Sequence, residues 1–96
     1  MPSKPKSRMS LEMRDLVRNM HPDLKKKVRL AFSEIIENPL VGKLLLGELR
    51  GMRCFRVSKF RIIYRHFSEI IEVITIGPRR SIYEETLRII KKEERK

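Results

Sequence analysis

FRIIYRHFSEIIEVITIG, residues 60–77, contains the two most strand-like segments of this chain. Residues 60–67 and 70–76 are rich in the aromatic and β-branched side chains that pack well on a pleated sheet. Only Ser68 and Glu69 separate the two segments, and so short a connection favours a hairpin. The sequence therefore predicts two neighbouring antiparallel strands here.

The residues before this hairpin extend the predicted sheet. Residues 52–58 have a similar composition, and Lys59 stands where they must turn into 60–67. A brief apolar run, 44–49, precedes them. We predict an antiparallel meander of three main strands, 52–58, 60–67 and 70–76.

Helical spacing of apolar residues appears on both sides of the predicted sheet. It runs through 11–20 and 24–36, and His21-Pro22-Asp23 separates these two segments, so they should form a helical hairpin. Ser81 followed three residues later by Glu84 matches a capping box, which predicts a last helix. The expected fold is α+β: an N-terminal helical hairpin packed on one face of a small antiparallel β-sheet, with a C-terminal helix at its edge.

Length and cysteine content bound the organisation of the chain. Its 96 residues suit one domain, which we place at 11–96, with residues 1–10 as a flexible basic arm. The arm has no apolar stretch behind it, so it is neither a signal peptide nor a membrane span. Cys54 is the only cysteine, which excludes an internal disulfide and predicts a reducing, cytoplasmic location.

The charge of the chain points to polyanionic partners. It has 23 Lys and Arg against 12 Asp and Glu, a formal net charge of +11 and a pI of about 10.4. Nucleic acid, an anionic membrane surface or an acidic protein segment could each meet this charge. Charge alone does not choose among them.

Strand alternation brings basic residues to one face of the predicted sheet. Arg61 lies opposite the face that carries the aromatic residues of its strand, and Arg56 falls on the face of Arg61. Arg79 follows the turn at Gly77, and Tyr83 comes from the first turn of the last helix. We predict that Arg56, Arg61, Arg79 and Tyr83 converge.

This set of side chains suits a phosphodiester. Attack of a ribose 2′-hydroxyl on the neighbouring phosphate builds negative charge on phosphorane oxygens, which guanidinium groups can bind two at a time. We expect the surrounding cations to favour the phenolate of Tyr83 and so to lower its pKa. The same ring could instead stack on a base.

Other catalytic devices fit the sequence less well. His21 and His66 are not expected to meet, and the glutamates are scattered over different elements, so we predict no metal site and no cofactor. Two structural alternatives also stay open: Arg61 could pair with Glu72, and Tyr83 could only anchor its helix. Tyr64 is expected in the core.

Residues 22–90 resemble the RelE/ParE superfamily of bacterial and archaeal toxins. The segments that carry the resemblance are Glu37-Asn38-Pro39, Gly42-Lys43, Leu49-Arg50-Gly51, Phe55-Arg56-Val57, Phe60-Arg61-Ile62-Ile63-Tyr64 and Gly77-Pro78-Arg79-Arg80-Ser81-Ile82-Tyr83. Their order and spacing are more specific for the superfamily than for one activity within it.

The resemblance, taken to the RelE-like branch, implies a translation-inhibiting toxin that cleaves messenger RNA in the ribosomal A site, without metal, by 2′-hydroxyl attack. It implies an acidic antitoxin, the ribosome and mRNA as partners, and neither a membrane nor a small-molecule substrate. The implied catalytic residues are Arg56, Arg61, Arg79 and Tyr83. The expected RNA contacts are Lys25, Lys26, Lys27, Arg53, Lys59 and Arg80, although the lysine run could equally be a solvated helix face.

Two departures from the family pattern accompany the resemblance. Some RelE-like toxins have a second lysine where this chain has Ser58, although Lys59 stands next to it. The family usually begins with an edge strand, which is missing here or poorly formed by Pro5 to Met9, leaving an edge for a partner. The alternatives are a ParE-like poison of DNA gyrase and a non-catalytic RNA-binding or ribosome-binding module.

Overall fold

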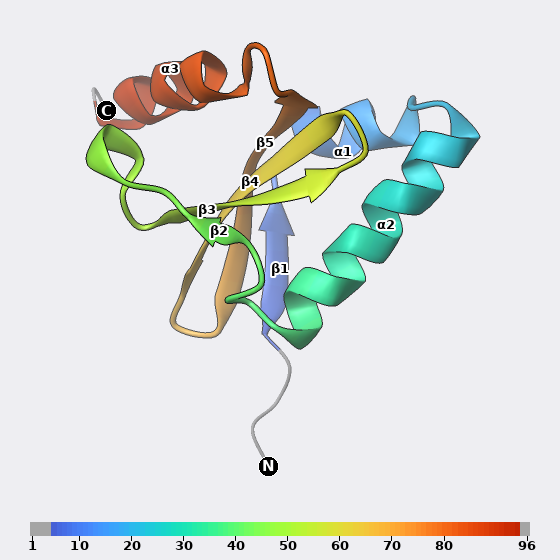
Figure 1. Cartoon of the computed structure of the whole chain (residues 1–96), viewed down its shortest axis with the longest axis horizontal. Coiled ribbons are helices and arrows are strands. Elements are labelled where there is room, and N and C mark those ends of the chain that lie inside the picture. The colour runs from blue at the N-terminus through green and yellow to red at the C-terminus, as the bar shows by residue number, and fades with distance from the viewer. Residues whose placement is uncertain (1–4, 95–96) are drawn as a thin grey trace.

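The computed structural model describes residues 5–94. It has a five-stranded sheet with helices on both faces (Figure 1). In chain order its elements are β1 (Lys6–Met9), α1 (Leu11–Arg18), α2 (Pro22–Glu37), β2 (Lys43–Leu44), the 3-10 turn η1 (Gly47–Leu49), β3 (Met52–Val57), β4 (Phe60–Phe67), β5 (Ile70–Pro78) and α3 (Ile82–Glu94). The α+β class and the three predicted main strands are confirmed.

The sheet has the order β1-β5-β4-β3-β2 and is mixed, because β1 runs parallel to β5 while the other pairs are antiparallel. The expectation of a wholly antiparallel sheet is therefore corrected. Lys6–Met9 is an edge strand, so of the two alternatives for this segment the strand is confirmed and the flexible arm is wrong. Pairing with β5 fixes this segment, and Arg8 adds a 2.7 Å hydrogen bond to Glu72. Residues 1–4 of the expected arm lie outside the described part of the chain.

Local capping begins both N-terminal helices. The Ser10 hydroxyl accepts a 3.2 Å hydrogen bond from the N–H of Met13 at the start of α1. His21 does the same for α2, where its Nδ1 accepts from the N–H of Asp23 at 3.2 Å, and Pro22 occupies the first turn. The helices then pack against each other as the predicted hairpin.

Strand alternation gives the sheet two apolar faces. Ile62 and Tyr64 join α1 and α2 in one core cluster, whereas Ile63 joins a second cluster with Ile82 of α3. The last helix therefore covers the second face of the sheet. The expectation that it lies at the edge of the sheet is corrected. The reason is that this face of the sheet is itself apolar and must be buried against another element.

Tyr64 ties the loop after α2 to the sheet. Its side chain is fully buried; its hydroxyl donates a 2.7 Å hydrogen bond to the Pro39 carbonyl and accepts a 2.9 Å one from the N–H of Gly42. A Cβ at Gly42 would lie only 2.7 Å from that hydroxyl oxygen, so the close approach requires glycine. The expected core position of Tyr64 is confirmed.

Candidate functional site

Two arginines face each other near the β3–β4 turn, at one end of the sheet. Arg56 of β3 and Arg61 of β4 are direct register partners. Their strand neighbours Phe55, Val57 and Ile62 pack into the α1–α2 core, so both arginines belong to the α3 face. The sequence predicted this shared face correctly.

The turn before α3 adds the other two residues. Arg61 pairs with Gly77 near the end of β5, so the chain leaves the sheet beside Arg61 and passes through Arg79 into α3. Tyr83 lies in the first turn of α3, and the charges of Arg61 and Arg79 both act on its hydroxyl. We call Arg56, Arg61, Arg79 and Tyr83 the arginine–tyrosine cluster.

The guanidinium groups of this cluster are free to meet an external anion. Among residues 5–94, no carboxylate forms an ion pair with Arg56, Arg61 or Arg79, whereas Arg8 and Arg88 each have one carboxylate partner and Arg65 has two. Arg61 is half-buried and donates a 3.0 Å hydrogen bond to the carbonyl of Phe60. Arg56 and Arg79 are exposed. The cluster thus has three cations and no counter-charge from the described part of the chain.

The alternative that pairs Arg61 with Glu72 is wrong. Glu72 accepts hydrogen bonds from Arg8 at 2.7 Å and from Arg65 at 2.5 Å. Burial alone would raise the pKa of Glu72, but these two arginines outweigh burial and lower the pKa below its usual value. Arg65 also reaches Glu93 of α3 at 3.4 Å, so this network joins β1, β4, β5 and α3 away from the cluster.

Tyr83 holds its proton more firmly than the sequence suggested. Burial of the phenol raises the pKa of Tyr83, and the neighbouring Cys54 raises it further, while Arg61 and Arg79 pull it down without prevailing. The expectation of a lowered pKa is therefore corrected. Since the ordinary pKa of tyrosine is already about 10, the hydroxyl is protonated at neutral pH. It can donate a hydrogen bond but is a poor base.

Cys54 is the neighbour that the sequence reading missed. The Tyr83 hydroxyl donates to its sulfur at 4.0 Å, and the Cys54 residue is 9% exposed. A signal was present, because alternation already placed Cys54 on the face of Arg56. The sequence analysis considered Cys54 only as a possible disulfide partner or metal ligand and not as a hydrogen-bond acceptor.

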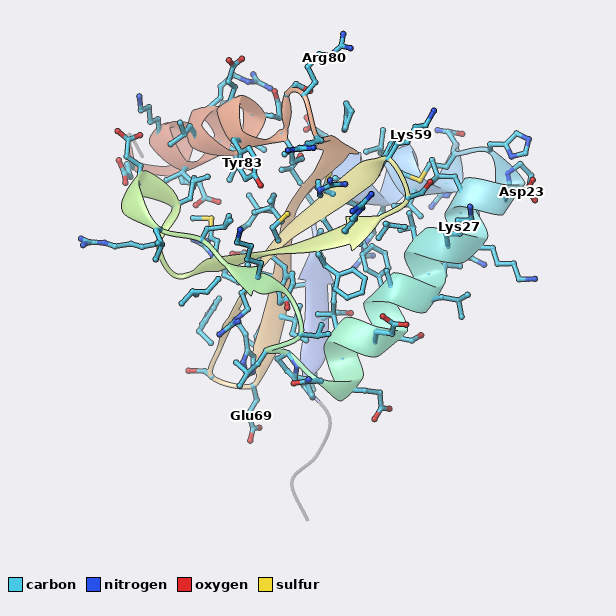
Figure 2. The ribbon with its side chains drawn as sticks, viewed as in Figure 1. Asp23, Lys27, Lys59, Glu69, Arg80 and Tyr83 are labelled. Atoms are coloured by element: carbon cyan, nitrogen blue, oxygen red, sulfur yellow. The ribbon has the colours of Figure 1, made fainter. Side chains whose placement is uncertain are left out.

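The predicted RNA contacts separate into three places. Lys59, in the β3–β4 turn, and Arg80, in the β5–α3 turn, are exposed at the same end of the sheet as the cluster, because Phe60 pairs with Pro78 there (Figure 2). The three lysines 25–27 lie on α2, which covers the opposite face of the sheet; Figure 2 labels Lys27 there. They can extend a basic surface but cannot join the cluster.

Arg53 has a different environment from the other predicted RNA contacts. Its guanidinium donates to the carbonyls of Leu40 at 3.2 Å and Gly42 at 2.9 Å. Its register partner is Tyr64, so it lies on the face opposite Arg56. The structure gives Arg53 a part in holding the loop after α2.

Neither histidine lies in the cluster. His21 caps α2, and His66 pairs with Ile71 near the far end of β4. Within the described residues, no three His, Cys, Asp or Glu side chains gather in a way that could hold a metal ion. None of the helices described is long and apolar enough to cross a membrane.

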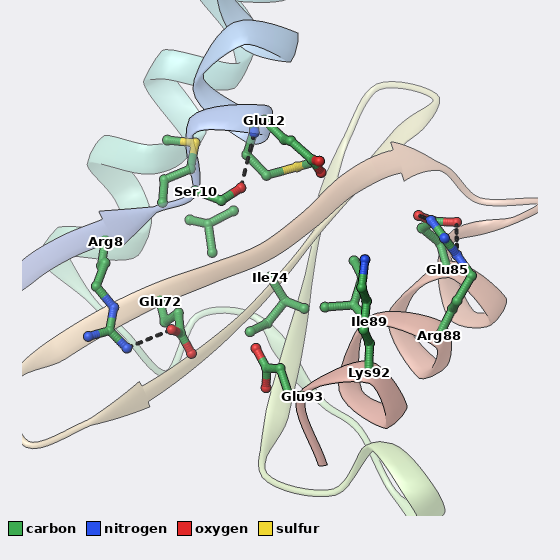
Figure 3. A pocket seen from close by; sticks show the side chains of 13 residues that line it. Arg8, Ser10, Glu12, Glu72, Ile74, Glu85, Arg88, Ile89, Lys92 and Glu93 are labelled. Carbon is green, nitrogen blue, oxygen red and sulfur yellow. Dashed lines mark hydrogen bonds and ion pairs between the residues drawn. The ribbon is translucent and has the colours of Figure 1, made fainter. Parts of the chain in front are cut away.

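A separate hollow of about 580 Å³ lies between β1, β5 and α3 (Figure 3). Its walls include Arg8 with Glu72 and Arg88 with Glu85, and these opposite charges pair with each other. No member of the arginine–tyrosine cluster lines it. Because four carboxylates line it, Glu12, Glu72, Glu85 and Glu93, against the three cations Arg8, Arg88 and Lys92, this hollow offers an external anion less than the cluster does.

Comparison with known proteins gives consistent relatives. The sequence matches the model of the ParE-like toxin of type II bacterial toxin–antitoxin systems over residues 8–87. The structure is similar to the toxin–antitoxin complex RelBE2 from Mycobacterium tuberculosis, with 26% identity, 80% of this chain and 100% of that chain covered, and a TM-score of 0.67. No curated protein sequence matches significantly.

More distant structures have the same fold. A mutant of the Escherichia coli toxin RelE in the free state is 16% identical over 90% of this chain and 97% of that chain, with a TM-score of 0.70. The archaeal RelE–RelB complex from Pyrococcus horikoshii is 12% identical over 80% and 97%, with a TM-score of 0.63.

The predicted resemblance to the RelE/ParE superfamily is confirmed. The family match runs from β1 into α3 and includes every member of the arginine–tyrosine cluster. The chain belongs to the ParE-like toxin family of type II bacterial toxin–antitoxin systems.

Proposed function

We propose that this toxin is a ribosome-dependent endoribonuclease that cleaves messenger RNA by attack of a ribose 2′-hydroxyl on the adjacent phosphate, and so inhibits translation in the cytoplasm. The observation that carries the proposal is that Arg61 and Arg79 act on Tyr83, that Arg56 faces Arg61, and that none of the three arginines has a carboxylate partner among the described residues. An RNA phosphate supplies the missing counter-charge.

Each residue of the cluster has a role in this proposal. Arg61 is held half-buried, so it binds the scissile phosphate in a fixed geometry. Arg56 and Arg79 stabilise the charge that grows on the phosphorane oxygens. Tyr83, which stays protonated, donates its proton to the leaving 5′-oxygen or stacks on a base. The reaction needs no metal in this scheme.

The dependence on the ribosome has a physical rationale. The cluster contains charge-stabilising donors, but arginine and a protonated tyrosine abstract protons poorly. Lys59 is a further basic group, in the turn between the two arginine strands. The 2′-hydroxyl proton then passes to solvent water. We propose that the ribosome orients the RNA for in-line attack and so offsets the absence of a general base in the cluster.

The proposed inhibitor is an antitoxin with an acidic, flexible segment. Solved relatives of this fold include toxin–antitoxin complexes. A net charge of +11, and three arginines that have no carboxylate partner within residues 5–94, favour an acidic chain that orders on binding and covers Arg61 or displaces α3. A tight complex with an acidic partner that leaves both Arg61 and α3 unchanged would contradict this mode of inhibition.

A second candidate function is poisoning of DNA gyrase. The ParE-like description of the matching family favours it. In that case the arginines would contact protein or DNA and would not need to stabilise a phosphorane. A non-catalytic role in binding RNA or the ribosome uses the same side chains as phosphate contacts.

The deciding experiment is expression in a translating extract, with the 5′ ends of a reporter message mapped. The wild type is compared with Arg61→Ala and with Arg88→Ala, which removes the same charge from a residue that pairs with Glu85 on α3. We expect codon-positioned cuts with the wild type and Arg88→Ala, and loss of these cuts with Arg61→Ala or when initiation is blocked.

The other outcomes identify the alternatives. Intact message together with inhibited supercoiling by purified gyrase would establish the gyrase poison. Intact message with arrested translation and retained ribosome binding would establish the non-catalytic module. Cleavage by Arg61→Ala at the wild-type rate would remove the cluster from the reaction.

A further inference from the structure

Cys54 lies next to the arginine–tyrosine cluster and has no part in the reaction proposed above. It sits in the interior of β3, where Lys43 of β2 and Ile63 of β4 are its register partners. The residue is 9% exposed and belongs to the apolar cluster under α3. Strands on both sides and a helix above therefore fix the position of its thiol.

The backbone of Tyr83 is held in place by its buried neighbour, whereas its ring is largely exposed. The preceding residue, Ile82, is 1% exposed and anchors the first turn of α3 in the same apolar cluster as Cys54. Tyr83 itself is 42% exposed. Among the described residues, the sulfur of Cys54, at 4.0 Å, is the hydrogen-bond partner of its hydroxyl. This contact joins the end of the phenol to the fixed sulfur.

The chemistry of sulfur suits such a contact. The phenol donates toward the sulfur, which is a weak acceptor, so its proton remains available to a stronger one. Arg61 and Arg79 act on the same hydroxyl from the side of the cluster. A phosphate oxygen that binds these arginines would therefore meet a hydroxyl that is already in place.

We propose that Cys54 is a positioning residue for Tyr83, whose phenol it holds beside the arginines so that the proton can pass to an RNA oxygen. The catalytic part of this inference rests on the proposed function; the contact itself does not. The raised pKa of Tyr83, to which Cys54 contributes after burial, supports the same arrangement.

A purely structural role makes a different prediction. A buried cysteine often serves only as a small apolar group, and its replacement then changes stability alone. Met52 provides a matched control, because it lies on the same face of β3, is 6% exposed and belongs to the same apolar cluster. Met52→Val should lower stability without changing the environment of the Tyr83 hydroxyl.

The first test is independent of catalysis. The chain has two tyrosines and no tryptophan, so the difference in tyrosinate absorbance between each protein and its Tyr83→Phe counterpart isolates the titration of Tyr83. We expect Cys54→Ala and the bulkier Cys54→Val to ionise Tyr83 at lower pH than the wild type, and Cys54→Ser to restore part of the shift. Circular dichroism at each pH verifies the fold.

A titration of Tyr83 that is the same in wild type, Cys54→Ala and Cys54→Val would overturn the proposal. So would an equal shift in Met52→Val, because the effect would then come from general loosening of the core. Using both alanine and valine keeps the test decisive if one variant does not fold.

The second test measures coupling in the cleavage assay. Cys54→Val should slow cleavage roughly 10-fold through misplacement of the phenol. In the Tyr83→Phe background the same change should have no further effect, because the group that Cys54 positions is gone. Independent, multiplicative losses would contradict positioning. If the wild type does not cleave RNA, the proposed function fails, while the titration still decides the Cys54–Tyr83 contact.

Discussion

Arg56 and Arg61 oppose each other directly across β3 and β4, on the face that α3 covers. Like charges at opposed positions destabilise an antiparallel pair. In the described part of the chain no carboxylate neutralises either guanidinium. The sheet therefore bears a local electrostatic cost, and a bound anion would remove it.

Relief of this repulsion should stabilise the free protein. Arg56→Thr is expected to raise the free energy of unfolding by about 0.2–1 kcal/mol, because threonine suits a strand and leaves Arg61 unopposed. Urea denaturation measures the change. Arg53→Thr on the same strand is the contrast: it removes hydrogen bonds to Leu40 and Gly42 and should destabilise. Equal losses in both variants would contradict the repulsion.

Arg79 should matter for its shape as well as its charge. Arg79→Ala is expected to slow cleavage by more than ~100-fold because it removes a donor to the phosphorane. Arg79→Lys should recover only part of the rate, since an ammonium group cannot bind two oxygens as a fork. Single-turnover cleavage on programmed ribosomes measures both, with thermal unfolding as the check on the fold. Parallel losses of rate and stability would make Arg79 structural.

Tyr64 and Gly42 should be coupled in their effect on stability. Tyr64→Phe leaves the Pro39 carbonyl and the Gly42 N–H without their partner, at a cost of about 1–3 kcal/mol. Gly42→Ala forces a Cβ against the Tyr64 hydroxyl and ring. Because part of that clash is with the hydroxyl, Gly42→Ala should cost less in the Tyr64→Phe background. Additive losses in a denaturation cycle would exclude this coupling.

The Glu72 network should make stability depend on acid pH. The folded pKa of Glu72 lies below its usual value of 4.5, so the folded state binds fewer protons than the unfolded state near that value. The contribution to stability is therefore present above pH 4.5 and is lost as the pH falls through the folded pKa. Denaturation at several pH values should show a shallower acid decline for Glu72→Gln. If the stability of Glu72→Gln declines with acid as steeply as that of the wild type, other titratable groups cause the acid sensitivity.

Lys26 is expected to act on ribosome binding and not on the chemical step. Lys26 is exposed on α2, on the sheet face opposite the cluster. Lys26→Ala should weaken ribosome binding modestly and reduce the salt dependence of that binding by about one charge. Lys91→Ala, on the last turn of α3, removes the same charge as a control. If the two variants bind the ribosome with the same affinity and salt dependence, α2 contributes no more to the contact surface than α3 does.

Much of the fold followed from local pattern. Alternation along 60–67 and 52–58 assigned Tyr64 to the core and put Arg56 and Arg61 on one face, and both assignments agree with the structure. Such assignments succeed because side chains on a strand must point to alternate faces whatever the rest of the chain does. The pairing partner of Lys6–Met9 was not visible, since a four-residue edge strand has little pattern of its own.

The features of the candidate site likewise fall into those that the sequence determined and those that the tertiary structure decided. Sequence alone determined which residues carry the charge and which face of each strand presents them, because those depend on residue type and on a period of two. Only the tertiary structure decided that α3 covers the second face, that Arg53 turns to a loop, and that Tyr83 rests against Cys54 and keeps its proton. Burial and the balance of neighbouring charges set these features, and both depend on residues that are distant along the chain and close in the folded protein.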